Sequence, residues 1–125
     1  MPESRTLIPI YTTRGDLGAY LLYPYLYNAQ GEWIGWVEPD RRVFSVHGHY
    51  VGWLSEDPRI LRRRAEGYEE PRRRPPSVPQ PIKPPARIPL PRLMSELTFG
   101  ILDVLEECPE LLPPIDFGEL RQDMD

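Results

Sequence analysis

A repeat of glycine and aromatic residues, offset by 17 positions, is the feature that most constrains the fold of this chain. The segment Gly31–Leu54 contains two copies, Gly-Glu-Trp-Ile-Gly-Trp-Val and Gly-His-Tyr-Val-Gly-Trp-Leu, and Gly15–Leu21 fits the same template with one residue deleted. A β-prone run precedes each copy. Glycine readily takes the positive φ that a hairpin reversal requires, so each unit predicts a strand, a tight turn and a second strand.

The repeat predicts a mainly β fold in which antiparallel hairpins form a meander or ring over residues 6–70. The expected copies lie near residues 8–21, 23–38 and 43–55, with turn glycines at Gly15, Gly31 and Gly48. For the following segment two interpretations stay open. One is a fourth, degenerate copy over 59–68, and the other is a short helix over 58–65 that begins at Pro58.

Both faces of the predicted strands carry large apolar groups. Simple alternation places Trp33 and Val37 on one face and Ile34 and Trp36 on the other. A hairpin module of this size buries little surface, so self-association as a tetramer or dimer would cover the second face. The expected core or interface anchors are the large aromatic residues of the strands, Tyr20, Trp33, Trp36, Tyr50 and Trp53.

These residues also carry a family likeness. Pro9–Gly15, followed by Ala19-Tyr20 and by the two Gly-x-x-(Ile/Val)-Gly-Trp copies, resembles the bacterial 4-fold β-flower proteins. The resemblance covers roughly residues 8–67 and implies a repeated-hairpin fold with a Pro- and Arg-rich low-complexity tail. It implies no reaction. The Leu21–Pro24 stretch and the blurred fourth copy depart from strict fourfold regularity.

A proline-rich segment follows the module. Residues 71–92 hold nine prolines and six basic side chains and no acid, whereas residues 93–125 hold nine acids and a single basic residue. Proline removes backbone donors and favours extended geometry, so 71–92 is expected to be a semi-rigid linker of polyproline II type. The opposite charges of the two segments should attract, weakly.

The spacing of apolar residues from Leu90 to Cys108 alternates between four and three, which predicts an amphipathic helix over 93–108, followed by an acidic tail over 109–125. A helix this short needs a surface to pack on. That surface could belong to the β module, to a second copy of the chain or to another protein. The expected docking residues are Leu97, Phe99, Ile101, Val104 and Leu105.

Few residues suggest chemistry. His47 and His49 share a strand face but lack an obvious third metal ligand, and Cys108 lies near the end of the predicted helix, where the helix dipole disfavours a thiolate. We therefore expect no catalytic residue, no metal and no cofactor. Two basic runs leave nucleic-acid association as the alternative, through Arg62, Arg63, Arg64, Arg72, Arg73 and Arg74.

The sequence thus predicts a protein that is not an enzyme. The expected function is a self-assembling structural or interaction module whose Pro-rich segment and helix dock in trans or on a protein partner. A basic, apolar leader is absent from the first residues, no apolar run reaches the ~18 residues of a membrane span, and there is one cysteine. These features favour a cytoplasmic protein with no membrane association.

Overall fold

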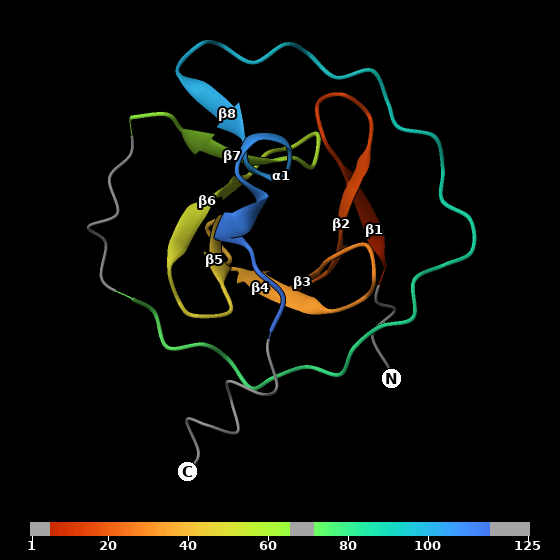
Figure 1. Ribbon diagram of the computed structural model, residues 1–125, viewed down its shortest axis with the longest axis vertical. Coiled ribbons are helices and arrows are strands. Elements are labelled where there is room, and N and C mark those ends of the chain that lie inside the picture. The colour runs from red at the N-terminus through yellow and green to blue at the C-terminus, as the bar shows by residue number, and fades with distance from the viewer. Residues whose placement is uncertain (1–5, 66–71, 116–125) are drawn as a thin grey trace.

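The computed structural model describes residues 6–65 and 72–115, which form one curled sheet with a short helical segment at its mouth. Eight strands of the described residues follow one another in chain order and pair antiparallel with their neighbours. The strands are β1 (Ile8–Tyr11), β2 (Leu17–Leu22), β3 (Tyr25–Tyr27), β4 (Trp33–Val37), β5 (Arg42–Ser45), β6 (Tyr50–Leu54), β7 (Ile60–Arg63) and β8 (Ile101–Asp103). The sheet curls into a half-barrel (Figure 1).

The strands form four hairpin-like pairs, which we call petals 1 to 4: β1–β2, β3–β4, β5–β6 and β7–β8. The tips of petals 1 to 3 share one hydrogen-bonding pattern, in which the first turn residue donates to the carbonyl four positions later. The three predicted turn glycines lie at these tips with φ of +96°, +89° and +87°, at Gly15, Gly31 and Gly48. Their positive φ explains the preference for glycine there.

Every one of petals 1 to 3 also contains a register shift just after its tip. In petal 2, Tyr27 pairs with Trp33 while Leu26 pairs with Gly35, so Ile34 is an extra residue. Such a bulge moves the following side chains to the opposite face. The simple alternation expected for this strand is therefore wrong: Trp33 and Trp36 share the outer aromatic cluster, whereas Ile34 and Val37 share the inner core.

Two apolar clusters cover the two faces of the sheet, as the sequence predicted. The inner core is aliphatic and includes Ile10, Leu26 and Ile60, all fully buried. The outer cluster is aromatic and receives Ile82 and Ile88 from the Pro-rich segment. The chain therefore covers part of this outer face itself.

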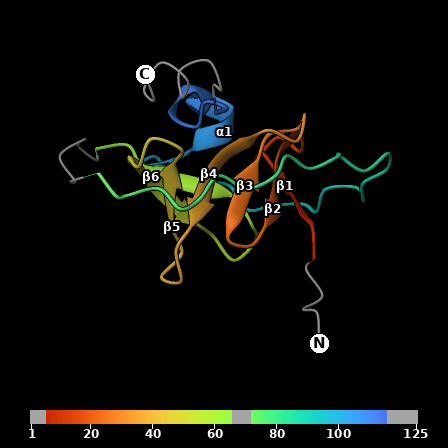
Figure 2. The same cartoon turned by 90° about the horizontal axis from the view of Figure 1, so that it is seen from below.

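The Pro-rich segment, which we call the strap (residues 72–98), runs around the outside of the petals (Figures 1 and 2). It forms no helix or strand, as its prolines predicted. At its end the chain turns at Thr98–Ile101 and enters β8, which pairs with β7. The fourth petal is therefore built from two segments far apart in the sequence.

This arrangement corrects two expectations. The short helix over 58–65 does not form, because Ile60–Arg63 is strand β7. The fourth copy expected over 59–68 is correct only for its first strand, since the second strand comes from residues 101–103; positions 66–68 lie outside the described residues.

A helix forms near the C-terminus as predicted, but the bounds expected for it, 93–108, are wrong. Residues 93–108 divide into an extended stretch, strand β8 and a single helical turn, α1 (Val104–Glu107), followed by a 3₁₀ turn, η1 (Pro109–Leu111). Gly100 weakens a helix at its middle, and the unpaired edge of β7 offers ladder hydrogen bonds that a lone helix could not match. Val104 and Leu112 instead enter the inner core at the mouth of the half-barrel.

Candidate functional site at the seam between petals 1 and 4

The two edges of the sheet, β1 and β8, meet through side chains. Thr13, at the tip of petal 1, donates twice to Oδ2 of Asp103, from its backbone N–H and from its hydroxyl, each at 2.8 Å. Arg59 Nη1 donates to the same threonine hydroxyl at 3.0 Å. Arg59 and Asp103 are almost completely buried. A charged network therefore joins petals 1 and 4 where no ladder of hydrogen bonds does.

Arg59 also holds the strap and the β6–β7 turn. Its guanidinium donates to the Ser95 carbonyl at 3.0 Å and forms an ion pair with Asp57 at 2.6 Å. Partial burial opposes ionisation of Asp57, but hydrogen bonds from Arg59 and Ser55, together with the charge of Arg59, lower the pKa of this carboxyl. Among the described residues, Arg59 Nε and Asp103 Oδ1 are buried polar atoms with no hydrogen-bond partner.

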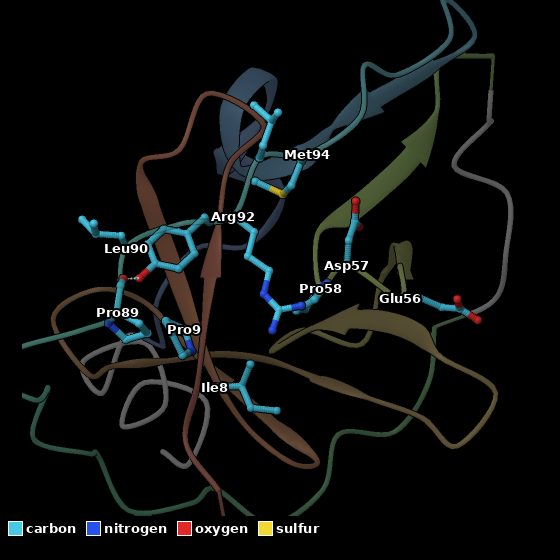
Figure 3. Close-up of a pocket in the computed structure, with 11 residues that line it drawn as sticks. Ile8, Pro9, Glu56, Asp57, Pro58, Pro89, Leu90, Arg92 and Met94 are labelled. Atoms are coloured by element: carbon cyan, nitrogen blue, oxygen red, sulfur yellow. Dashed lines mark hydrogen bonds between the residues drawn. The ribbon is translucent and has the colours of Figure 1, made fainter.

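A hollow of about 600 Å³ lies beside this network, between the start of β1, the β6–β7 turn and the strap (Figure 3). Its lining is mostly apolar, and Arg92 extends from the strap toward Pro58 within it. The lining comprises Ile8, Pro9, Tyr11, Glu56, Asp57, Pro58, Pro89, Leu90, Arg92, Leu93 and Met94. This size and character are typical of a binding hollow.

Two leucines of the same lining project outward into solvent. Leu90 is 90% exposed and Leu93 is 102% exposed. Phe99, which is 90% exposed, lines a second and smaller hollow of about 320 Å³, whose lining includes Thr13 and Asp103 of the network. Large apolar side chains exposed so close together mark a surface suited to binding. We call Leu90, Leu93 and the 600 Å³ hollow the seam patch.

The predicted aromatic anchors lie in or near the outer cluster. Tyr20, Trp33 and Trp36 are buried, whereas Tyr50 and Trp53 are half-buried. Trp36 stacks on Phe44 with ring centroids 5.3 Å apart, and Tyr50 meets Phe44 edge-on. These rings stand on the petals, away from the seam patch.

The predicted docking residues are divided between core and surface. Val104 is buried in the inner core and Leu105 packs against it. Ile101 is half-buried in β8 and Leu97 is half-buried in the strap. Only Phe99 is widely exposed, with the Arg64 guanidinium 5.5 Å from its ring centre. The structure does not bring these five residues together on one helix face.

The predicted arginine runs are spread over the molecule and largely engaged within the chain. The buried Arg62 donates to the Val51 carbonyl, and Arg64 pairs with Glu107. Arg72 donates to the His47 carbonyl, and Arg73 pairs with Glu38 while lying over Phe44. Arg63 and Arg74 are exposed.

The cysteine and the two histidines lie in separate places and different environments. Burial, reinforced by nearby Glu110, raises the pKa of the Cys108 thiol, which disfavours the nucleophilic thiolate. His47 and His49 are exposed at the tip of petal 3. Within residues 6–65 and 72–115 no group of three or more side chains is placed to hold a metal ion. No helix of the described residues is long and apolar enough to cross a membrane.

The sequence analysis did not predict the seam network, nor which residues of the strap face the petals. The network joins positions as distant as Thr13 and Asp103, and no local pattern relates them. The strap did carry a signal, because its half-buried residues recur every third position apart from Pro84, which takes the place of Pro85. They are Pro76, Pro79, Ile82, Pro84, Ile88, Pro91, Met94 and Leu97. Three residues is the repeat of a polyproline II helix.

Comparison with known proteins supports the repeat architecture. A family model described as 4-fold beta flower protein matches residues 8–100, which include petals 1 to 3, β7 and the strap. No curated protein and no solved structure matches the chain.

Proposed function

The chain belongs to the 4-fold beta flower family, and from this architecture we propose that it is a non-catalytic module that self-associates through its seam patch. The observation that carries the proposal is the exposure of Leu90 and Leu93, at 90% and 102%, beside an apolar hollow of about 600 Å³. Leu90 and Leu93 are themselves among the residues that line this hollow. Water contact at such side chains is costly, and a second protein surface removes it.

The seam patch is suited to a second copy of the same chain. A two-fold interface places the same patch on both partners, so it must be self-complementary. Here a projecting leucine pair borders an apolar hollow. In a symmetric dimer the leucines of each copy would enter the hollow of the other.

The expected affinity is modest. Burying a leucine side chain contributes about 1.5–3 kcal/mol. Four leucines in a dimer therefore offset much of the roughly 4–15 kcal/mol that association costs in lost freedom. Because these opposing free energies are of similar size, we expect a weak dimer whose population depends on concentration.

The test is sedimentation velocity of the full-length chain over a concentration series. We expect the mass to shift from monomer toward dimer, and L90S/L93S to stay monomeric at the concentrations where the unaltered chain dimerises. The matched control is V78S, because Val78 is another exposed strap residue, 46% exposed, that does not line the hollow. A dimer that persists in L90S/L93S, or a chain that is monomeric throughout, would contradict the proposal.

The nucleic-acid alternative has weaker support. Four of its six arginines have partners within the chain, and the sequence carries a net charge of −4. If this function applied, binding of a DNA oligonucleotide would weaken steeply with salt, and R63A/R74A would reduce it most, because these two side chains are exposed.

A further inference from the structure

The strap meets the tips of the petals at a fixed interval. Arg73 N–H donates to the Gly48 carbonyl at 2.8 Å, and Ile82 N–H donates to the Gly31 carbonyl at 3.0 Å. A further nine residues along, Pro91 lies beside Gly15 at the tip of petal 1, with its Cγ 3.4 Å from where a Cβ on this glycine would lie. The strap therefore advances nine residues, or three polyproline II turns, for each petal that it passes.

A second contact accompanies the first with a constant offset. Tyr27, just before the tip of petal 2, donates its hydroxyl to the Gln80 carbonyl at 3.2 Å, two residues before Ile82. Tyr11, in the same place on petal 1, donates to the Pro89 carbonyl, two residues before Pro91. The tip of petal 2 thus contacts the extended strap at two backbone positions, two residues apart.

Differences between the petals have a chemical cause. Petal 2 makes both contacts. Petal 1 lacks the hydrogen bond from the strap to the glycine carbonyl, because Pro91 has no N–H. Petal 3 lacks the hydroxyl contact, because Phe44 stands where the other two petals have tyrosine. Two of the three tips therefore keep one contact each, and the position of the strap stays the same.

The surface beneath the strap is apolar and aromatic. Ile82 and Ile88 pack against the outer cluster, and the side chain of Arg73 lies over the Phe44 ring at 5.3 Å. The carbonyl acceptors, tyrosine donors and aromatic rings together resemble the features by which proteins bind polyproline II peptides. Gly31 and Gly48 allow the close approach, since a Cβ on either would lie 2.0 Å from a strap carbonyl oxygen.

We propose that the tips of petals 1 to 3 form a binding site for polyproline II peptides that carry an apolar residue at every third position, with the strap as its resident occupant. The ligand is a proline-rich segment of a partner protein that replaces the strap. At petal 1 this site shares Tyr11 and Pro89 with the hollow of the seam patch, whereas its contacts at petals 2 and 3 involve none of the residues that line that hollow. Covalent attachment gives the strap a high effective concentration, so a separate peptide binds well only when the strap is weakened.

The test uses the full-length chain and a fluorescein-labelled peptide with the sequence of residues 72–92. In I82S/I88S the strap loses its two apolar contacts with the outer cluster. We expect this variant to bind the peptide at least tenfold more tightly than the unaltered chain does. Adding Y27F should weaken binding several-fold, whereas adding Y23F should not, because Tyr23 is exposed and has no described contact with the strap.

A control peptide tests whether binding depends on the spacing of the apolar residues or only on the amino-acid composition of the peptide. It exchanges Ile82 with Lys83 and Ile88 with Arg87, which keeps the residues and moves the apolar stripe off its face. Equal binding of the two peptides, or no binding to a variant with native near-UV circular dichroism, would overturn the proposal. If I82S/I88S does not fold, NMR of the unaltered chain with millimolar peptide decides: the amides of Gly31 and Gly48 must shift, and unchanged amides would refute the site.

Discussion

Petals 1 to 3 and petal 4 reach the same shape by different routes. In petals 1 to 3 a turn of four or five residues connects neighbouring strands, and it contains a glycine with positive φ. In petal 4 the strands are joined by the whole strap, and the Arg59–Thr13–Asp103 network holds the far edge. Local hairpin chemistry can therefore specify three petals, whereas the fourth depends on contacts that form only when the chain has circled the molecule.

The sharpest contrast lies between the tip glycines of the two kinds of petal. G31A should destabilise the protein by about 3 kcal/mol or more, because alanine at φ +89° is strained and its Cβ would lie 2.0 Å from the Ile82 carbonyl oxygen. G100A, at petal 4, should cost less than about 0.5 kcal/mol, since nothing lies within 4 Å of the new Cβ. Urea unfolding measures both. Equal losses would contradict the contrast.

Removal of the seam carboxylate should affect petal 4 and the tip of petal 1 that it holds, and leave petals 2 and 3 unchanged. D103A leaves the Thr13 N–H and hydroxyl without their acceptor, at a cost of about 2–3 kcal/mol. We expect faster hydrogen exchange in β7 and β8, with β3 to β6 unchanged. E107A is the matched control, because its pair with Arg64 is exposed and contributes about 0–1 kcal/mol. Uniformly faster exchange in all strands would show that petal 4 is not a separate unit.

A smaller effect concerns pH at the β6–β7 turn. The pKa of Asp57 is lowered in the folded protein, since Arg59 and Ser55 outweigh partial burial. A depressed folded pKa contributes stability above the unfolded value of about 3.9, and this contribution is lost as the pH falls through the folded pKa. D57N should reduce the dependence of stability on pH below about 4, whereas E56Q should not. If the free energy of unfolding of D57N falls with pH below about 4 as steeply as that of the unaltered chain, this role is contradicted. The effect is small because Asp57 is partly exposed.

The sequence predicted what local chemistry determines. The turn glycines, the three hairpins and the extended strap follow from residues close in the chain, such as Gly31 and its neighbours. The faces predicted for the side chains of β4 were wrong because of the bulge at Ile34, and a bulge depends on pairing with another strand. The helix expected near Phe99 failed because the free edge of β7 competes for the same residues. The candidate site was missed because Leu90 and Leu93 look like part of that helix until the strap is placed.

The strap and β8 are part of the folded unit. The most direct measurement compares the full-length chain with a chain that ends at residue 65, by near-UV circular dichroism and light scattering. Without the strap the outer aromatic face is bare and β7 loses its partner, so the truncated chain should lose its tryptophan dichroism and aggregate or expand. A truncated chain that is compact, with the dichroism of the full-length protein, would contradict the account.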